Sequence, residues 1–256
     1  MSLRRTITSK VQDLLKKQPA RGEVEQAVDT AAMYCKKDRP TRSFEDFFKH
    51  LKALGFSPEM CIDVGAAIGT KTIYQAFRTS KHIVFEPLPD FQAKLRKTLE
   101  PYDHVLHECV LSDQPGEVTL LRHNDLFGSS IMHGHDDQDE RVISVQSSTL
   151  DIELKSVSSE GPFLLKTDCQ GSDLMVLKGG IETLRRCEVV IVEASLFRFW
   201  GQHQPDFYDI VSFMKSHDFV LYDILDGLFR PRDSALGQID LAFVKEHGMF
   251  REQHYW

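Results

Sequence analysis

Short apolar runs alternate with amphipathic stretches along most of this chain. The apolar runs have the length of buried strands, and the stretches between them carry apolar residues at helical spacing. Strands that alternate with helices are typical of a parallel sheet with helical crossovers, so an α/β fold is predicted. The predicted strands are Met60–Val64, His82–Phe85, Val105–Leu111, Phe163–Thr167, Glu188–Glu193, Phe219–Ile224 and Ile239–Val244. The predicted helices are Thr70–Arg78, Pro89–Glu100, Asp173–Arg186 and Pro205–Ser216.

The two ends of the chain depart from this alternation. The last two predicted strands are joined by residues 225–238, rich in Gly, Pro and Asp, which suits an antiparallel hairpin at the end of the sheet. Residues 1–56 contain apolar positions at helical spacing and are predicted to be a helical N-terminal extension of a domain spanning 57–256. Residues 1–21 are locally basic and form either a solvated helix face or a dock for an acidic partner or membrane surface. A pairing of this amphipathic end with a second copy, giving a homodimer, is also open.

One stretch interrupts the rhythm between the third and fourth predicted strands. Strand-like runs at 117–121 and 142–145 flank the polar segment Gly128–Glu140, and we predict a hairpin insertion over 117–146 with a mobile tip. The tip carries side chains of metal-binding type, His133, His135, Asp136, Asp137, Asp139 and Glu140. A polar loop tip is the simpler interpretation, and no metal site is expected here.

The segment CIDVGAAIGT, residues 61–70, has the pattern of a nucleotide-binding loop. An apolar run ends at Asp63, a loop bracketed by Gly65 and Gly69 follows, and a helix is predicted next. The second apolar run ends at Glu86, about 20 residues on, where a carboxylate can accept bonds from both ribose hydroxyls. A dinucleotide site would prefer Gly-x-Gly-x-x-Gly, and Ala67 stands in place of the second glycine. The loop therefore favours S-adenosylmethionine over a dinucleotide.

The cofactor site predicted from this pattern combines the loop, the acidic strand end and the turn after the third strand. Asp113 could accept from the adenine amino group, or could cap the turn Asp-Gln-Pro-Gly in which it lies. The predicted cofactor-binding residues are Asp63, Gly65, Ala66, Gly69, Thr70, Glu86, Pro87 and Asp113.

Two carboxylates follow later strands at the edge where ligands of open α/β sheets bind. Asp168 follows FLLKT, and Glu193 follows EVVIV. Transfer of a methyl group to a hydroxyl requires removal of its proton, and Asp168 is the first choice for that general base, with Glu193 second. Lys166 or His203 could orient the substrate.

Other roles for these residues remain open. Asp168 could instead cap the following helix, or it could hold a divalent ion together with Glu193. The aromatic side chains of Phe197, Phe199 and Trp200 could form a wall against the acceptor, or could pack in the core. Acceptor choice is expected to depend on Gly128–Glu140, Phe197–His203 and the N-terminal helices.

Composition narrows the class of protein. The net charge of −7, from 31 basic and 38 acidic residues, argues against nucleic acid as a partner. No apolar run reaches the roughly 18 residues of a membrane span, and the N-terminus MSLRRTITSK lacks a signal-peptide core. The 5 cysteines include no CxxC pair, which fits a reducing compartment. A cytoplasmic location is predicted.

The chain resembles the FkbM family of S-adenosylmethionine-dependent methyltransferases. The resemblance runs from about Met60 to Val244. Its motifs are IDVGAAIG, VFEPLPD, LSDQPGEVTL, GSSIM, LLKTDCQGSDLMVLKGG and VVIVEAS, and the C-terminal LYDILDGLFRPRDSALGQIDLAFVKE is also similar to members of the family. It implies a class I methyltransferase fold, with a mostly parallel seven-stranded sheet, and O-methylation of sugars or other small-molecule hydroxyls.

Two positions depart from the family pattern. The family often has Asn where Ala67 stands, and it usually has Asp-Val-Glu-Gly where this chain has Asp168-Cys169-Gln170-Gly171.

From the resemblance as a whole we expect an O-methyltransferase acting on a hydroxyl of a small molecule or glycan. An NAD-dependent enzyme on a related sheet, and a module that binds the cofactor without turnover, are the alternatives.

Overall fold

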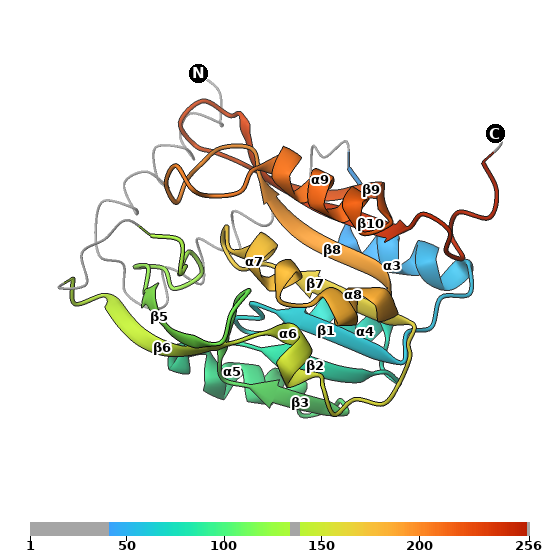
Figure 1. Ribbon diagram of the computed structural model, residues 1–256, viewed down its shortest axis with the longest axis horizontal. Coiled ribbons are helices and arrows are strands. Elements are labelled where there is room, and N and C mark those ends of the chain that lie inside the picture. The colour runs from blue at the N-terminus through green and yellow to red at the C-terminus, as the bar shows by residue number, and fades with distance from the viewer. Residues whose placement is uncertain (1–40, 134–138, 255–256) are drawn as a thin grey trace, which may run out of the picture.

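The strands form one large and one small sheet in the computed structural model, which describes residues 41–133 and 139–254 (Figure 1). The large sheet has 7 strands in the order β3-β2-β1-β7-β8-β10-β9. Neighbours from β3 to β8 are parallel, and β10 is antiparallel to both β8 and β9. The bounds are β1 Met60–Val64, β2 Lys81–Phe85, β3 His104–His107, β7 Phe163–Thr167, β8 Cys187–Ser195, β9 Phe219–Phe229 and β10 Leu236–Lys245. The predicted mostly parallel sheet with a C-terminal antiparallel hairpin is confirmed.

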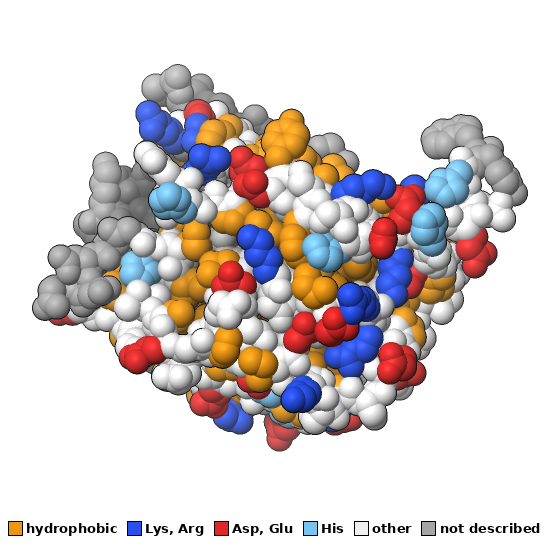
Figure 2. All heavy atoms as spheres, in the orientation of Figure 1, with side chains coloured by type: hydrophobic (Ala, Val, Ile, Leu, Met, Phe, Trp, Pro, Cys, Tyr) orange, Lys and Arg blue, Asp and Glu red, His pale blue; other side chains and the backbone are white. Residues whose placement is uncertain are grey.

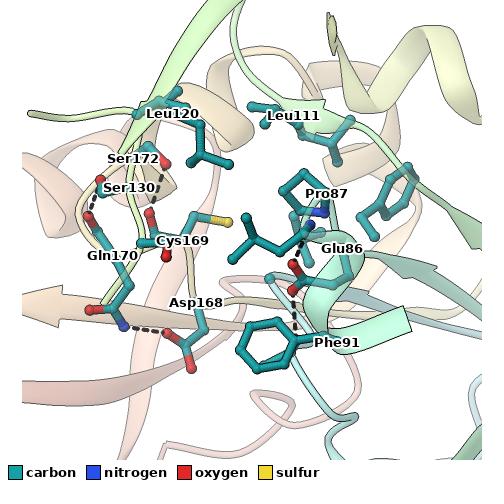
Figure 3. A pocket seen from close by; sticks show the side chains of 18 of the residues that line it. Glu86, Pro87, Phe91, Leu111, Leu120, Ser130, Asp168, Cys169, Gln170 and Ser172 are labelled. Carbon is teal, nitrogen blue, oxygen red and sulfur yellow. Dashed lines mark hydrogen bonds between the residues drawn. The ribbon is translucent and has the colours of Figure 1, made fainter. Parts of the chain in front are cut away.

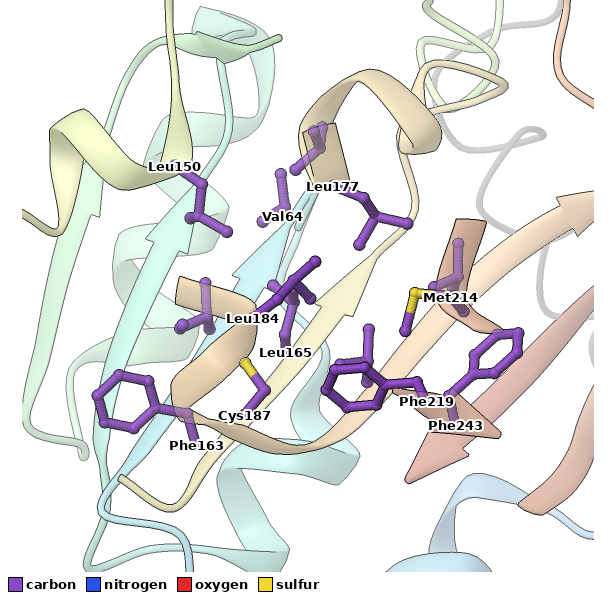
Figure 4. Close-up of a cluster of buried hydrophobic side chains, with 14 of the residues drawn as sticks. Val64, Leu150, Phe163, Leu165, Leu177, Leu184, Cys187, Met214, Phe219 and Phe243 are labelled. Atoms are coloured by element: carbon purple, nitrogen blue, oxygen red, sulfur yellow. The ribbon is translucent and has the colours of Figure 1, made fainter. Parts of the chain in front are cut away.

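Helices cover both faces of this sheet because its central strands are apolar on both sides. In β7, Phe163 and Leu165 belong to one buried cluster and Leu164 to the other. Figure 4 shows the first cluster, where Leu177, Leu184 and Met214 pack over the strands. Its helices are α6 Leu150–Glu153, α7 Asp173–Lys178, α8 Ile181–Arg186 and α9 Phe207–Ser216, and the opposite cluster includes side chains of α3 Phe44–Ala53, α4 Lys71–Ala76 and α5 Pro89–Leu99.

The small sheet contains the strands of the predicted hairpin. It has 3 strands in the order β4-β6-β5, namely β4 Val110–Leu111, β5 Gly116–Leu121 and β6 Val142–Ser148. β5 and β6 pair antiparallel, while β4 lies parallel to β6. The single strand predicted over Val105–Leu111 is therefore wrong, because the chain leaves the large sheet after His107 and β4 pairs with β6 instead.

Three further predictions of local structure need correction. The helix expected over Asp173–Arg186 breaks into α7 and α8 at Gly179, where an added Cβ would lie 2.2 Å from the carbonyl oxygen of Ser112. The connection expected over residues 225–238 is shorter, since β9 and β10 extend to Phe229 and from Leu236. Asp168 is not a helix cap, because the N-cap position of α7 is Ser172. The helices predicted before residue 41 lie outside the described residues.

Candidate cofactor and acceptor site

A cavity of ≈ 250 Å³ lies where β1, β2 and β7 end (Figure 3). This is the carboxyl edge of the parallel strands, where ligands of open α/β sheets bind. One side is apolar and is lined by Leu88, Phe91, Leu111, Leu120, Leu126, Phe127 and Ile131. The polar lining comes from Glu86, Ser129, Ser130, Asp168, Gln170 and Ser172. Glu86 and Asp168 are the carboxylates among these described lining residues, and they come from different strand ends.

Asp63 organises the loop below the cavity. Its carboxylate is fully buried and accepts from the backbone N–H of Thr70 at 3.2 Å, from the Thr70 hydroxyl at 3.0 Å, and from the Tyr74 hydroxyl. These bonds join the end of β1 to the beginning of α4, and they therefore set the curvature of the loop between them. Asp63 does not itself line the cavity.

Gly65 permits the loop to pack against the segment that follows β7. Its φ of +73° is in the left-handed region, and an added Cβ would lie 2.0 Å from the carbonyl oxygen of Asp168. The residue donates its N–H to the carbonyl of Phe85 at 3.0 Å. A side chain at this position would separate the ends of β1 and β7, so the glycine brings the two carboxylate-bearing segments to one cavity.

Glu86 presents its carboxylate to the cavity in a fixed orientation. One oxygen accepts from the N–H of Ala67 at 2.7 Å and the other from the N–H of Leu88 at 2.9 Å. Each carboxylate oxygen retains acceptor capacity beyond these bonds. Burial is the largest influence and raises the pKa of Glu86 to about 7, although both N–H bonds oppose the rise. This arrangement fits the two hydroxyls of a ribose.

Asp168 is held from two sides at the opposite end of the cavity. The ammonium of Lys166 lies 3.1 Å from one oxygen, and the side-chain amide of Gln170 donates to the other at 3.0 Å. Lys166 is buried and also lies 3.9 Å from Asp63. Burial favours the neutral amine, but attraction to Asp168, Asp63 and Asp240 raises the pKa of Lys166 above its ordinary value. The ammonium thus neutralises part of a strongly acidic cluster.

Glu193 belongs to the same cluster. The Gln170 amide that bonds Asp168 also donates to Glu193, at 3.1 Å. Burial, followed by repulsion from Asp168, raises the pKa of Glu193 well above its ordinary value. The structure therefore brings Lys166, Asp168 and Glu193 together as the sequence suggested, with Gln170 between the two carboxylates.

The other predicted residues lie around the cavity or away from it. Gly65, Glu86, Pro87 and Asp168 line it, whereas Ala66, Gly69, Thr70 and Asp113 do not. Asp113 accepts from the Ser112 hydroxyl at 3.2 Å. His203 is exposed. The predicted roles of all these residues stay predictions.

The aromatic segment after β8 lies outside the cavity lining. Phe197 is stacked under the guanidinium of Arg230 at 3.7 Å, and Phe199 is 45% exposed. Trp200 packs near Gly171, whose added Cβ would lie 2.8 Å from its ring. Trp200 therefore borders the loop that carries Asp168, and none of the three aromatic side chains is a member of the buried clusters.

Sequence reasoning missed much of the apolar lining. Leu120, Leu126, Phe127 and Ser129–Ile131 belong to β5 or to the segment after it, and they share the cavity with Glu86. The sequence pattern relates Gly128–Glu140 only to acceptor choice. The closely spaced apolar residues of LLRHNDLFGSSIM are a signal for burial, but nothing in the sequence indicates which strand end they face.

Charged side chains show no single-sign surface on the face in Figure 2, where acidic and basic groups are intermixed. That face therefore lacks the continuous basic surface that binding of nucleic-acid phosphates requires. Within residues 41–133 and 139–254, no group of three or more His, Cys, Asp or Glu side chains is arranged to hold a metal ion. The tip residues His135, Asp136 and Asp137 lie outside these ranges. None of the described helices combines the length and apolar composition of a bilayer crossing.

The sheet order, the glycine loop after β1 and the carboxylate at the end of β2 are the arrangement of a class I methyltransferase fold. A family model described as "Methyltransferase FkbM domain" matches residues 63–221, more than half of the 256 residues. The chain belongs to the FkbM methyltransferase family, and its cofactor is S-adenosylmethionine. Membership of this family therefore excludes the alternative of an NAD-dependent enzyme.

Several solved structures are similar to this chain at low sequence identity. The O-methyltransferase from Bacillus cereus, in complex with SAH, is 11% identical, with a TM-score of 0.48 and coverage of 94% of this chain and 99% of that one. The ribosomal protein L11 methylase from Lactobacillus delbrueckii subsp. bulgaricus is 10% identical, with a TM-score of 0.43 and coverage of 80% and 77%. The precorrin-6y C5,15-methyltransferase from Geobacter metallireducens GS-15 is also 10% identical, with a TM-score of 0.41 and coverage of 78% and 87%. The comparison with curated proteins gave no significant match.

Proposed function

We propose that this methyltransferase transfers the methyl group to a hydroxyl of a small molecule or glycan, with Asp168 as general base. The observation that carries the proposal is the position of Asp168, which lines the cofactor cavity while Lys166 and Gln170 hold its two oxygens. A fixed carboxylate beside the cavity can accept the proton of an alcohol. Family membership alone does not specify the acceptor.

S-adenosylmethionine supplies the electrophilic methyl group and its leaving group when bound. Glu86 is the residue best placed to hold the ribose, because its carboxylate faces the cavity and is oriented by two backbone N–H groups. Gly65 and Ala67 line the loop side of the cavity, where the amino-acid end is expected. The apolar side chains on the other side suit a flat ring, with Leu111 and Phe91 among them.

Asp168 is a better base than Glu193 for a physical reason. The raised pKa of Glu193 favours its protonated form, which accepts no proton. Asp168 is oriented by the ammonium of Lys166, which lies 3.1 Å from one of its oxygens. Its side chain is 33% exposed, so an acceptor can reach it. These contacts support Asp168 as the group that takes the proton.

Calorimetric titration with S-adenosylhomocysteine, followed by transfer of a labelled methyl group to a panel of sugars and alcohols, tests the proposal. Asp168→Asn should keep cofactor binding and lower turnover by about 10²–10⁴-fold, the usual contribution of a general base. Asp103→Asn, an exposed carboxylate change, serves as the matched control. Cofactor binding without transfer to any acceptor would indicate a binding module, and transfer undiminished in Asp168→Asn would refute the base.

We also propose a cytoplasmic location and retain the homodimer as a prediction. The thiols of Cys61, Cys109, Cys169 and Cys187 are free, which supports a reducing compartment. The segment that suggested pairing, residues 1–21, lies outside the described residues. Sedimentation of the full chain measures the oligomeric state directly.

A further inference from the structure

Gln170 has a strained backbone conformation between the two carboxylates of the acceptor side. Its φ of 49° is in the left-handed region, which side chains other than glycine rarely adopt. Its carbonyl accepts from the hydroxyl of Ser130 at 2.7 Å, and that hydroxyl accepts from the N–H of Met132 at 2.9 Å. Strain of this kind persists only where the surroundings enforce it, and it concentrates at functional sites.

The side-chain amide of Gln170 joins Asp168 to Glu193. A side-chain amide nitrogen carries two hydrogens. Nε2 of Gln170 donates to Oδ1 of Asp168 at 3.0 Å and to Oε2 of Glu193 at 3.1 Å. Figure 3 shows the bond to Asp168 beside the cavity. Two carboxylates this close to one atom would repel each other, and a shared neutral donor stabilises both without adding a charge.

The charges around this amide are strongly unbalanced. Lys166 on β7 is the cation that faces the cluster from the described elements packed against it. The acidic groups come from β1, the residue after β2, the loop after β7, α7, β8 and β10, and they are Asp63, Glu86, Asp168, Asp173, Glu193 and Asp240. A glutamate at position 170 would add another carboxylate and remove the donor that the cluster shares.

We infer that Gln170 is a positioning residue for methyl transfer, which orients Asp168 toward the cavity and allows Asp168 and Glu193 to remain adjacent. The inference rests on the proposed role of Asp168 as the base. The segment after β5 also takes part, because the Ser130 hydroxyl donates to the carbonyl of Gln170 and holds this strained residue in place.

Carboxyl NMR titration of the full-length protein tests this inference without an acceptor. The protein carries ¹³C-labelled Asp and Glu side chains, and Asp168→Asn and Glu193→Gln assign the two signals. In Gln170→Glu, the titration midpoints of the Asp168–Glu193 pair should rise by about one pH unit or more, because a third carboxylate joins them. Gln170→Ala and Gln170→Gly should raise the midpoints as well, since both remove the shared donor.

The glycine variant separates the amide from the backbone. Glycine relieves the left-handed strain, so agreement between Gln170→Gly and Gln170→Ala assigns the effect to the lost amide. Midpoints in all three variants within about 0.3 units of the unmodified protein would overturn the inference. If Gln170→Glu fails to fold, the other two variants still decide.

Turnover gives a second and distinguishable result once the panel supplies an acceptor. In Gln170→Glu, the acidic limb of the pH–rate profile should move to higher pH by about one unit, so kcat measured on that limb should fall about tenfold while kcat on the alkaline side of the limb is unchanged. The KM for S-adenosylmethionine should stay within about threefold. Equal loss at every pH would indicate a merely structural role and overturn the inference. A protein that methylates nothing would refute the proposed function instead, and the NMR titration would still settle the role of Gln170.

Discussion

Cofactor affinity should rise with pH because Glu86 must be ionised to bind ribose hydroxyls strongly. Burial raises the pKa of Glu86 to about 7 in the protein without cofactor. With that value, the ionised fraction grows from about one-eleventh at pH 6 to about ten-elevenths at pH 8. The affinity for S-adenosylhomocysteine should therefore increase about tenfold over this range, or about 1.4 kcal/mol. The sign follows from linkage, since a ligand that prefers the ionised carboxylate releases its proton on binding.

Glu86→Gln is the control that isolates this carboxylate. The amide cannot ionise, so the variant keeps every other titration of protein and ligand but loses this one. At pH 8 it should bind about 30-fold more weakly, because charge-assisted hydrogen bonds contribute about 2 kcal/mol. At pH 6 the difference should shrink to about threefold, the quotient of the two effects.

Calorimetry from pH 6 to 8, in buffers of different ionisation enthalpy, measures both the affinity and the number of protons released. The unmodified protein should release close to one proton at pH 6 and fewer at pH 8. A flat affinity profile, or the same slope in Glu86→Gln, would refute the reasoning that Glu86 titrates on binding.

Three further outcomes follow from the packing. Gly65→Ala should lower the free energy of unfolding, measured by urea denaturation, by about 3 kcal/mol, because the added Cβ collides with the loop after β7. Gly55→Ala is the control, since Gly55 also has a positive φ, +88°, but has nothing within 4 Å of an added Cβ, and it should cost about 1 kcal/mol. Lys166→Met should cost about 3 kcal/mol in the same assay because it leaves buried carboxylates without their cation, while exposed Lys49→Met should change stability by less than about 0.5 kcal/mol. Burial lowers the pKa of His82, so the neutral imidazole contributes fully to stability above the unfolded value of 6.5, and this contribution is lost as the pH falls below that value. The free energy of unfolding should then fall by up to about 1.4 kcal/mol per pH unit, and denaturation of His82→Phe should not show this slope.

The sequence alone determined the order of elements and the first part of the cofactor site. Apolar runs of strand length and the glycine loop are local signals, so β1, β2, β7 and the position of Glu86 could be predicted directly. The reversal at the end of the sheet was also predictable, because residues 225–238 are rich in Gly, Pro and Asp, which favour a turn over a helical crossover. Such features depend on neighbours in the chain, and no distant contact is needed to infer them.

Tertiary structure decided which distant residues share the cavity. The break after His107 exists because Val110–Leu111 pairs with β6, and no local pattern indicates that partner. A separate bridge between Leu121 of β5 and Ser130 holds the residue whose hydroxyl donates to the carbonyl of Gln170, 40 positions further along the chain. The link between Asp168 and Glu193 likewise depends on the register of β7 and β8. Sequence predicts what each segment can form, whereas charge, strain and burial at the site arise only when the strand ends are packed side by side.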